Sequence, residues 1–464
     1  MEHKFDVVVI GTGSAASTAA SRCRAAEWSV AIVDKRPFGG TCALRGCDPK
    51  KVLVGAADVV KWARRMKGKG IATGDLHIEW PELMAFKKTF TEPYPGQKET
   101  QFQKSGIAMF KGVARFVSHN RLTVGDDTLE ARYFVIATGK KPAPLGIPGA
   151  ALAITSDLFL ELESLPKRVV FIGGGYISFE FAHVASAAGA EITIVHRGPR
   201  ALTGFDPDLV SMLVDDMKDA GMRIVLNTRA EAIGRVDGSV RLHAVENGQK
   251  RTFEADLIVH GAGRVPEIDD LSLETAGVAF EERGVTVNEY LQSTSNPSVY
   301  AAGDAAASGN PSLTPVAGFE GEVVADNLLH GNQRTGDAGA VPTVAFTIPP
   351  IASVGLLEND KRARELRFRT HFEQTQDWYA SRRIGERRSG FKVLIEEETE
   401  RVLGAHLLGH NAEEIINFFA LAIRSGIRVP DLKKIGELNT KKAGIKYFFD
   451  PGFFVSLCPL WLCV

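Results

Sequence analysis

Apolar runs and Gly-rich turns follow one another in a fixed order near the start of the chain. Residues 5–10 (FDVVVI) form an apolar run, residues 11–16 (GTGSAA) form a turn of small residues, and an Ala-rich stretch continues to about residue 26. A second apolar run, residues 29–33, ends at Asp34. Such runs are typical of buried strands. The pattern therefore predicts strand, turn, helix, strand and a closing acid, which is the order of a dinucleotide-binding unit.

The same order recurs later in the chain. Residues 168–172 (RVVFI) precede the glycines at 173–175, a helical stretch to about residue 188 and a second strand at 191–195. In both units the residue after the second strand stands 23 positions beyond the first glycine. One Gly-rich turn is weakly specific, whereas two with equal spacing and matching strands predict two nucleotide sites. The alternative is two βαβ units whose glycines are only structural.

The rest of the chain predicts further strands and a separate C-terminal region. Three strand-like runs end in small residues or acids, at 134–139, 256–263 and 299–304. Residues 227–253 alternate with short turns, as in a β-meander, and after Gly339 mixed strands and one long apolar helix (412–425) follow. We therefore expect an α/β fold with two Rossmann-like dinucleotide-binding domains and an α+β C-terminal domain.

The residues of the first unit indicate what it binds. Gly11 permits the tight turn, and Gly13 lets a pyrophosphate approach the N-terminus of the helix, where free N–H groups favour negative charge. Ala16 replaces the third glycine and still allows close packing of the helix on the strand. Asp34 is placed to accept hydrogen bonds from a ribose.

The second unit closes differently. His196 stands where the first unit has its acid, and Arg197 and Arg200 follow. A ribose 2′-hydroxyl loses its acceptor there, while a 2′-phosphate gains cationic partners, which favours NADPH. The alternative is that both arginines are solvated surface charges.

The composition fits a folded protein of about three domains and narrows its setting. The 464 residues carry 55 Lys and Arg against 56 Asp and Glu, so no basic surplus points to nucleic acid or to an anionic membrane. The first residues run directly into a strand with no signal-peptide pattern, and no apolar run is long enough to span a bilayer. Five cysteines are too few for a disulfide-stapled secreted scaffold, so we expect a reducing, cytoplasmic setting.

Two cysteines, Cys42 and Cys47, lie five positions apart just after the first unit. On a regular helix their Cα atoms would be about 8–9 Å apart, whereas a disulfide needs less than about 7 Å, so a bonded pair requires a distorted helix. Such a bond would be strained and reducible, and a helix N-terminus would favour the thiolate. C-x4-C without a second cluster is a poor zinc site, so we expect no metal; two inert buried thiols are the remaining alternative.

Residues 39–51 read GGTCALRGCDPKK. This motif after the first Gly-rich turn, together with the second turn and the AGD at 302–304, resembles the flavin-dependent pyridine nucleotide–disulfide oxidoreductases, which include glutathione reductase, dihydrolipoamide dehydrogenase and mercuric reductase. The resemblance runs from about residue 4 to about residue 434. It implies a discontinuous FAD-binding domain at 1–140 and 263–338, an NAD(P)-binding domain at 141–262 and a dimerisation domain at 339–464.

The resemblance assigns roles to the matching residues. The first unit would hold FAD and the second the nicotinamide cofactor, with Tyr176 as a gate over the flavin. Lys50 would pair with Glu180 beside the flavin ring, although without the family context the two residues read as surface charges. Electrons would pass from NADPH through FAD to the Cys42–Cys47 disulfide, with Cys47 on the flavin side and Cys42 attacking the substrate. The residues implied to bind the two cofactors are Gly11, Gly13, Ser14, Ala16, Asp34, Lys35, Gly40, Thr41, Lys50, Ala137, Thr138, Gly139, Gly173, Gly175, Tyr176, Ile177, Glu180, His196, Arg197, Arg200, Gly263, Arg264, Gly303, Asp304, Thr314, Pro315, Val316 and Ala317.

The C-terminal end departs from the resemblance. Relatives carry a His-Pro-Thr run and a nearby Glu, and this His is the acid–base catalyst of the partner subunit's site. The matching residues 435–443 read IGELNTKKA, and no histidine follows His410, which lies too early and is expected to be structural. The apolar tail from Tyr447 suggests an altered end. The competing idea is that Cys458 and Cys463 form a C-terminal shuttle dithiol.

The sequence shows more clearly which substrate is disfavoured than which substrate is used. Glutathione reductases present arginines to the carboxylates of glutathione at the positions of Ser21 and Glu322. Losing such contacts, about 1.5–3 kcal/mol each, disfavours glutathione. Asp48 stands where relatives have an apolar residue, and beside Cys47 its charge is expected to raise the pKa of the thiol and to reduce the thiolate at neutral pH.

These signals together predict an FAD- and NADPH-dependent reductase, with NADH as the other candidate reductant. Its substrate would be a small-molecule or protein disulfide or a thiol-bound compound, and the chain would form a homodimer with no nucleic-acid or membrane partner. The alternatives are an enzyme like dihydrolipoamide dehydrogenase or mercuric reductase, a diaphorase impaired in disulfide turnover because the base is missing, and a non-enzymatic nucleotide-binding protein.

Overall fold

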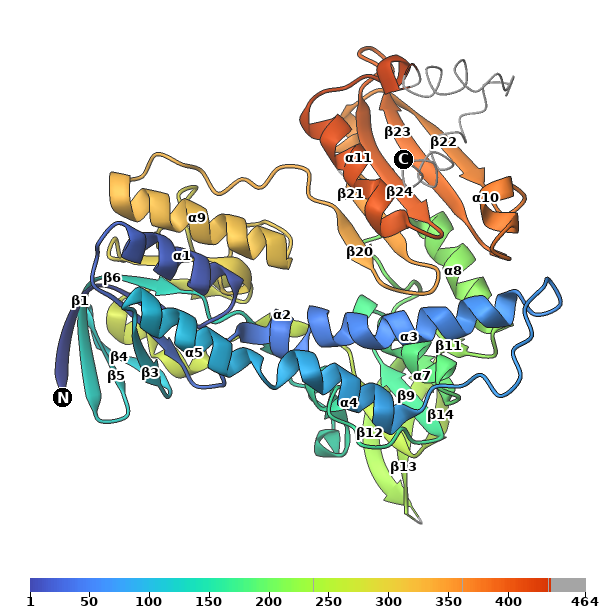
Figure 1. The fold of residues 1–464 in the computed structure, drawn as a ribbon, viewed down its shortest axis with the longest axis horizontal. Helices are drawn as coiled ribbons and strands as arrows, with labels where there is room; N and C mark the ends of the chain where they lie inside the picture. Colours follow the sequence, from blue (N-terminus) through green and yellow to red (C-terminus); the bar gives the residue numbers. More distant parts are fainter. Residues whose placement is uncertain (237, 361, 433, 435–464) are drawn as a thin grey trace.

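The computed structural model describes residues 1–236, 238–360, 362–432 and 434 (Figure 1). Its first sheet has seven strands in the order β3-β2-β1-β6-β5-β4, with β19 beside β6. The strands are β1 (Glu2–Ile10), β2 (Val30–Asp34), β3 (Ala108–Lys111), β4 (Ala114–Ser118), β5 (Arg121–Val124), β6 (Asp127–Ile136) and β19 (Val299–Ala301). β19 pairs with β6 in parallel although the whole second sheet lies between them in the sequence. The first sheet is thus built from two separate parts of the chain.

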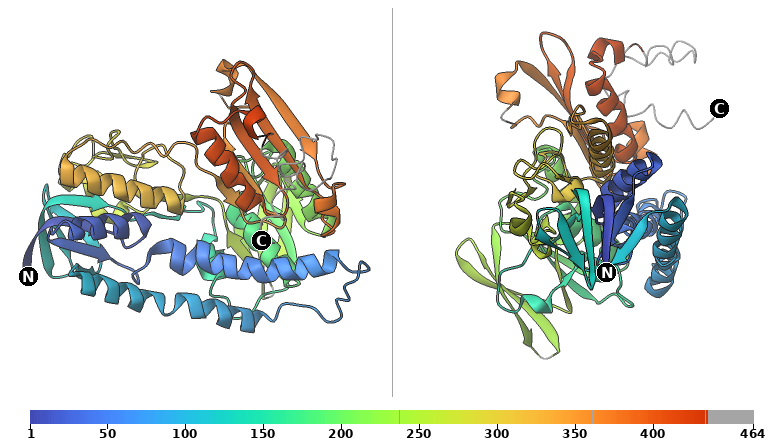
Figure 2. Two further views of the ribbon diagram at one scale, coloured as in Figure 1. Left: turned by 45° about the horizontal axis from the view of Figure 1, so that its top comes forward. Right: turned by 90° about the vertical axis from the view of Figure 1, so that its left-hand side faces the viewer.

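Two helices cover one face of this sheet. α1 (Ser14–Ala25) follows the first Gly-rich turn, and α9 (Thr314–His330) lies beside it (Figures 1 and 2). The helix backbones touch, since a Cβ built on Gly321 would lie 2.4 Å from the carbonyl oxygen of Ala15. This close packing fixes the start of α1 against the sheet.

The second sheet follows the second Gly-rich turn. Its five strands run in the order β11-β10-β9-β15-β8 and pair in parallel. Its elements are β8 (Ile154–Thr155), α6 (Ser156–Phe159), β9 (Arg168–Ile172), α7 (Tyr176–Ala187), β10 (Glu191–Val195), α8 (Pro207–Asp219), β11 (Arg223–Val225) and β15 (Leu257–His260). The predicted meander is confirmed as an antiparallel sheet of β12 (Thr228–Val236), β13 (Ser239–Glu246) and β14 (Gln249–Ala255). Both Gly-rich turns therefore lie between a central parallel strand and a helix.

A long helix links the two sheets. α2 (Gly40–Arg45) and α3 (Cys47–Arg65) follow β2, and α3 passes from the first sheet toward the second (Figure 1). Leu53 and Ala57 of α3 are fully buried in a core that also contains Phe179 of α7. α4 (Trp80–Thr91) packs on α3, and α5 (Tyr94–Ser105) continues the same layer (Figure 2). The start of α3 is thereby held between the two nucleotide units.

The C-terminal region is an antiparallel sheet with one long helix. The strand order is β20-β21-β24-β23-β22, with bounds β20 (Thr343–Ala345), β21 (Ile351–Gly355), β22 (Phe368–Gln374), β23 (Gly390–Glu396) and β24 (Val402–Leu408). α11 (Ala412–Arg424) confirms the helix predicted at 412–425 and buries Ile415, Ile416 and Phe419 in the core of this region. The α+β character predicted after Gly339 is therefore present.

A buried lysine fastens this sheet to α8. Lys392 of β23 is 2% exposed, and its ammonium lies 2.9 Å from Asp206 and 3.1 Å from Glu358 and also contacts Asp208. The three carboxylates lie within 4.8 Å of one another. The acidic cluster therefore already encloses a cation supplied by the chain itself.

The remaining elements are short. They are β7 (Lys140–Pro142) paired with β16 (Arg264–Pro266), β17 (Phe280–Glu281) paired with β18 (Gly284–Val285), α10 (Tyr379–Arg382), and the 3-10 turns Ala150–Leu152, Asp269–Leu271, Leu273–Ala276, Gly303–Ala305 and Ala363–Glu365. Across the described residues, no helix combines the length and the apolar character needed to cross a bilayer. The segment 435–443, the tail from Tyr447, and Cys458 and Cys463 lie outside the described residues.

Candidate active site

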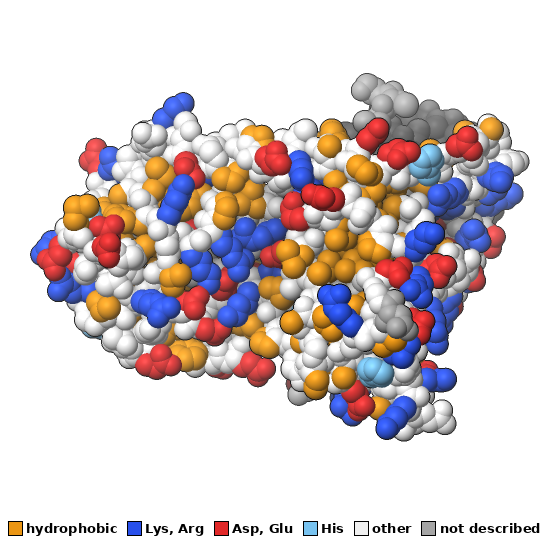
Figure 3. All heavy atoms as spheres, turned by 90° about the horizontal axis from the view of Figure 1, so that it is seen from below, with side chains coloured by type: hydrophobic (Ala, Val, Ile, Leu, Met, Phe, Trp, Pro, Cys, Tyr) orange, Lys and Arg blue, Asp and Glu red, His pale blue; other side chains and the backbone are white. Residues whose placement is uncertain are grey.

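Both Gly-rich turns and the cysteine pair line one cavity of about 1580 Å³. Figure 3 shows Lys and Arg side chains gathered around a hollow near the middle of one face of the molecule. Pockets for a drug-sized ligand measure about 300–1,000 Å³, so this cavity is large enough for two extended cofactors. The two nucleotide units therefore open into a shared space.

The first Gly-rich turn depends on contacts that side chains would block. Gly11 has a φ of +114°, and a Cβ there would lie 2.3 Å from the carbonyl oxygen of Ala137. A Cβ on Gly40 would lie 2.4 Å from the Cα of Gly13. The turn and the start of α2 therefore meet backbone to backbone, and Gly13 precedes the first residue of α1 at the cavity wall.

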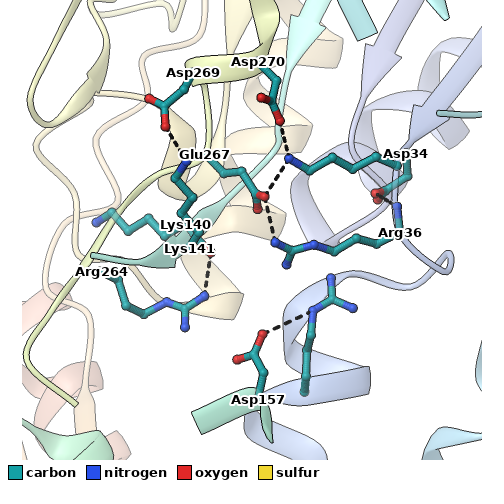
Figure 4. A network of polar contacts seen from close by, with 11 residues as sticks. Asp34, Arg36, Lys140, Lys141, Asp157, Arg264, Glu267, Asp269 and Asp270 are labelled. Atoms are coloured by element: carbon teal, nitrogen blue, oxygen red, sulfur yellow. Dashed lines mark hydrogen bonds and ion pairs between the residues drawn. The ribbon is translucent and has the colours of Figure 1, made fainter. Parts of the chain in front are cut away.

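The turn itself holds Asp34 in place. The hydroxyl of Thr12 donates a 2.6 Å hydrogen bond to the Asp34 carboxylate. Lys35, also predicted to bind a cofactor, lines the cavity but is paired with Glu267 at 3.0 Å and with Asp270 at 2.6 Å (Figure 4). Asp34 is thus fixed at the cavity wall, where a ribose could donate to it.

Ala16 does not fit its predicted role. It is fully buried in the core between α1 and the sheet and does not line the cavity. The third position of the motif faces the strand, so Ala16 serves helix packing and is not a cofactor ligand. The packing role predicted for the same residue agrees with its burial.

The second turn repeats the backbone geometry of the first. Gly173 has a φ of +116°, and a Cβ there would lie 2.4 Å from the carbonyl oxygen of Gly261. His196 fills the space over Gly174, where a Cβ would lie 2.6 Å from the imidazole ring. At this strand end the imidazole of His196 therefore stands in place of the acid and covers the Gly-rich loop.

The two arginines after His196 differ in position. Arg197 is exposed and lines the cavity, whereas Arg200 does not line it. The carbonyl oxygen of Arg200 lies 3.1 Å from Nε2 of His196, which ties this part of the loop back to the strand end. Arg197 is therefore the better placed of the two for a cofactor phosphate, and binding by Arg200 stays a prediction.

The two cysteines lie on either side of a helix break. Cys42 is in α2, Cys47 is the first residue of α3, and Gly46 between them departs from helical geometry with φ −143° and ψ −115°. A Cβ on Gly46 would lie 2.8 Å from the carbonyl oxygen of Thr41, so glycine allows the two segments to approach. The predicted distortion of the helix is confirmed. Both cysteines are free thiols in this structure and line the cavity.

The two thiols differ in acidity. A hydrogen bond from Cys42, another from Thr314 and the charge of Lys50 lower the pKa of Cys47 to about 6, against the opposing effect of burial. The shared hydrogen bond, followed by burial, raises the pKa of Cys42. At neutral pH the thiolate therefore resides on Cys47.

The Asp48 carboxylate changes the pKa of Cys47 in the predicted direction, but other groups have larger effects on that pKa. Its charge raises the pKa of Cys47, as expected, yet it is the smallest of the effects named for that thiol. The hydrogen bonds and the charge of Lys50 outweigh it. The predicted direction of the Asp48 effect is therefore confirmed, although the other groups leave the pKa of Cys47 below its ordinary value.

Lys50 and Glu180 form a buried ion pair. Their charged groups are 2.6 Å apart, and the Lys50 ammonium lies 4.3 Å from the ring centroid of Phe346. The Glu180 carboxylate also accepts a 2.8 Å hydrogen bond from the backbone N–H of Phe346. Because α3 and α7 pack together, these residues are not surface charges.

The other predicted cofactor-binding residues lie around the same cavity. Tyr176 begins α7. The residue as a whole is 48% exposed, but the protein around its hydroxyl desolvates that group and raises its pKa to about 12. Burial also raises the pKa of Asp304, and the charges of Lys140 and Arg264 offset part of this rise. The remaining members of the predicted set that line the cavity are Ser14, Gly40, Thr41, Ala137, Thr138, Gly139, Gly175, Ile177, Gly263, Gly303, Pro315, Val316 and Ala317.

Among the described residues, no histidine is placed to act as a base for the cysteine pair. His196 is the one histidine among the described residues that line the cavity, and it belongs to the second turn. The ring of His410 packs edge-on against Trp62 with centroids 5.2 Å apart, and its backbone N–H donates to Glu386 at 3.2 Å. These contacts agree with the structural role predicted for His410.

Several residues of the cavity wall were not predicted. Arg45 stands between the two cysteines, and its place inside the motif was an available signal. Phe346 contacts both Lys50 and Lys51 from the C-terminal region, and Glu413 lines the cavity from α11. Nothing in the sequence near the motif points to the last two contacts, because they depend on tertiary packing.

Comparison with known proteins identifies the family. Residues 5–321 match the family model described as pyridine nucleotide-disulphide oxidoreductase, and residues 341–435 match the dimerisation domain of that family. The chain belongs to the pyridine nucleotide-disulphide oxidoreductase family. Its members are flavoprotein disulfide reductases that bind FAD and a pyridine nucleotide, which confirms the predicted fold class and enzyme class.

Three relatives within this family carry different names. The chain is 33% identical over 425 residues to a glutathione reductase of Burkholderia cepacia, covering 91% of this chain and 93% of the relative. It is 30% identical over 433 residues to a mercuric reductase of Staphylococcus aureus (92% of this chain, 78% of the relative). It is also 30% identical over 435 residues to a dihydrolipoyl dehydrogenase of Chlamydia pneumoniae (93% of each chain). At such identities the family is fixed and the substrate is not.

Proposed function

We propose that this oxidoreductase uses NADPH and FAD to reduce a disulfide or thiol-linked substrate through Cys42 and Cys47. The observation that carries the proposal is the shared cavity, lined by two Gly-rich turns of matching geometry and by the cysteine pair. The division into FAD-binding (1–140 and 263–338), NAD(P)-binding (141–262) and dimerisation (339–464) domains is part of this proposal.

The first turn has the shape and charge that FAD requires. A Cβ on Gly40 would collide with Gly13, and Gly13 itself carries no side chain, so a pyrophosphate can approach the N-terminus of α1. Asp34 would accept hydrogen bonds from the ribose. FAD bound there would supply two-electron redox chemistry between the nicotinamide and the cysteine pair.

Residues of the second unit would hold NADPH. Gly173 and Gly175 would let its pyrophosphate approach α7, and Arg197 would pair with the 2′-phosphate. Tyr176 would cover the nicotinamide pocket. Lys50, fixed by Glu180, would place a positive charge beside the flavin ring.

The cysteine pair would transfer the electrons to the substrate. Cys42, once deprotonated, attacks one sulfur of a disulfide substrate and releases the first thiol. Cys47, already a thiolate at neutral pH, then attacks the Cys42 sulfur, releases the second thiol and restores the Cys42–Cys47 disulfide. The two leaving groups take up the proton of Cys42 and one proton from solvent, so the exchange balances.

A homodimer is the proposed assembly, because the match includes a dimerisation domain. Phe418 and Leu421 on α11 are 65% and 58% exposed, and a partner subunit would cover such an apolar helix face. Glutathione is not the favoured substrate, because the carboxylate of Glu322 pairs with Arg22 at 3.3 Å where a substrate carboxylate would need a cation.

A second candidate function is that of a diaphorase, which reduces acceptors at the flavin without disulfide turnover. One pair of observations favours it: the described cavity wall has no histidine near the cysteines, and the pKa of Cys42 is raised. Cys42 then lacks the base that disulfide exchange requires.

Cysteine substitutions test the proposal and separate the two candidates. Cys42→Ser is expected to abolish reduction of lipoamide, thioredoxin or another disulfide by NADPH while reduction of a dye persists. Cys23→Ser is the matched control, because Cys23 is buried away from the cavity and its pKa is raised to about 12 by burial. Disulfide turnover that survives Cys42→Ser would contradict the mechanism. Wild-type protein that reduces dyes but none of these disulfides would favour the diaphorase.

A further inference from the structure

Arg45 is a charged residue that the proposed chemistry leaves without a role. It is the last residue of α2, it stands between the two cysteines, and its side chain is 18% exposed. Its Nε lies 3.8 Å from Asp157, too far for a hydrogen bond, and within the described part of the chain this buried Nε has no hydrogen-bond partner. A partly buried guanidinium without an acceptor is costly, so the position favours an acceptor that the protein itself does not supply.

Glu267, which also acts on the charge of Arg45, is engaged by other cations. Glu267 lies 2.8 Å from Arg36 and 3.0 Å from Lys35, and Asp270 lies 2.6 Å from Lys35 (Figure 4). Burial, followed by the charge of Arg36, lowers the pKa of Arg45. The positive charge of Arg45 is therefore countered mainly by Asp157, at 3.8 Å and without a hydrogen bond.

The position of Arg45 on α2 directs it toward the first Gly-rich turn. Arg45 and Thr41 are four positions apart, so they share one helix face, and both line the cavity. α2 begins at Gly40, whose backbone touches Gly13 just before α1. Five residues of helix advance about 7.5 Å, and helical side chains lean toward the N-terminus, so a long arginine side chain can reach back toward the start of α1.

We propose that Arg45 is a positioning residue for FAD that binds its diphosphate from the side opposite the N-terminus of α1. The proposal rests on the proposed function, because it assumes that FAD occupies the first unit. The N–H groups at the start of α1 would contact one side of the diphosphate, and the planar guanidinium fork would donate to oxygens on the other. Arg45 would thereby couple cofactor binding to the short segment that carries Cys42.

The test measures binding by the apoprotein and does not use activity. FAD is removed, and the dissociation constant of FAD is measured by flavin fluorescence for wild type, Arg45→Met, Arg45→Lys and Asp157→Asn. Arg241→Met serves as the control, because Arg241 pairs with Glu254 on the meander and does not line the cavity. Displacement of FAD by ADP and by adenosine shows whether an effect resides in the diphosphate. Thermal unfolding of each apoprotein monitors the fold.

We expect Arg45→Met to weaken FAD and ADP by the same factor, about tenfold, and to leave adenosine unchanged. Arg45→Lys should recover part of the loss, while Asp157→Asn and Arg241→Met should bind FAD as wild type does. Unchanged FAD and ADP binding by Arg45→Met would overturn the proposal. An equal loss for adenosine, or in Asp157→Asn, would also overturn it, since Arg45 would then act through the fold or its ion pair. Wild-type apoprotein that binds neither FAD nor ADP would instead refute the flavoprotein proposal on which this one rests.

Discussion

The two Gly-rich units share a backbone and differ in the residue that closes the second strand. Gly11 and Gly173 have φ values of +114° and +116°, and a Cβ at either would lie within 2.4 Å of a carbonyl oxygen. At the strand ends, however, Asp34 is held by a hydroxyl, whereas His196 folds over the loop and Arg197 faces the cavity. The two turns thus share one backbone geometry, and we expect the different strand ends to decide which dinucleotide each prefers.

The two units also meet in a way that makes them one site. Lys50 follows the first unit and Glu180 belongs to the helix of the second, and their buried contact brings α3 against α7 beside Cys47. The comparison can be tested by breaking this contact first and then by changing each unit separately.

The largest effect is expected from breaking the contact between the units. Lys50→Met leaves Glu180 buried without its cation and should lower the free energy of unfolding by about 3–5 kcal/mol. The double variant Lys50→Met/Glu180→Leu should recover most of that loss, because neither charge is then unpaired. Lys51→Met is the matched control on the exposed side of the helix. Denaturant unfolding of the apoprotein measures the difference, and an equal effect of the two lysines would contradict the account.

Adding one methyl group to either turn should distinguish the functions of the two turns. In Gly13→Ala and Gly175→Ala the nearest contacts of the new Cβ would be 3.8 and 3.9 Å, so neither change should destabilise the fold. Each methyl would, however, stand where a pyrophosphate has to approach. We expect Gly13→Ala to lose flavin, and Gly175→Ala to keep flavin while its reduction by NADPH slows about 100-fold. Flavin content and stopped-flow reduction measure both, and loss of flavin from both variants alike would remove the distinction between the units.

A smaller effect is expected at the strand end of the second unit. Arg197→Ala should raise the KM for NADPH about tenfold or more and leave that for NADH unchanged, because one charge-assisted contact with a phosphate is lost. Arg200→Ala should change neither value, since Arg200 does not line the cavity. Steady-state kinetics with both reductants decides the point, and a larger effect of Arg200 than of Arg197 would reverse the assignment.

The smallest effect concerns the thiols between the units. Asp48→Val should lower the pKa of Cys47 slightly below its value of about 6, because the carboxylate raises it. Cys42→Ala should raise the same pKa by more than Asp48→Val lowers it, because it removes the Cys42 hydrogen bond, which is the largest effect. The folded-state pKa of Cys47 lies below the ordinary value of a thiol. Its contribution to stability is therefore present above that ordinary value and is lost as the pH falls through about 6.

The ultraviolet absorbance of the thiolate across the pH range measures these shifts, with Cys47→Ser as the blank. A rise in the pKa in Asp48→Val would contradict the electrostatic account of the pair.

Much of this architecture was predictable because it depends on local patterns. The spacing of Gly11 and Asp34, repeated at Gly173 and His196, placed both turns, and a disulfide at the five-residue spacing of the cysteines would require a helix break such as the one found at Gly46. The acidity of Cys47 was not predictable, because Asp48 is adjacent in the sequence while the stronger effect of Thr314 comes from a distant helix. Ala16, which is fully buried, was misplaced because sequence position does not show which way a side chain faces.

The most direct test counts the electrons that the purified flavoprotein accepts from NADPH in the absence of oxygen. If the Cys42–Cys47 pair accepts electrons in addition to the flavin, wild type takes up two equivalents of NADPH per flavin, and Cys42→Ser takes up one. Uptake of a single equivalent by wild type, or equal uptake by both proteins, would contradict the claim that a cysteine pair beyond the flavin receives the electrons.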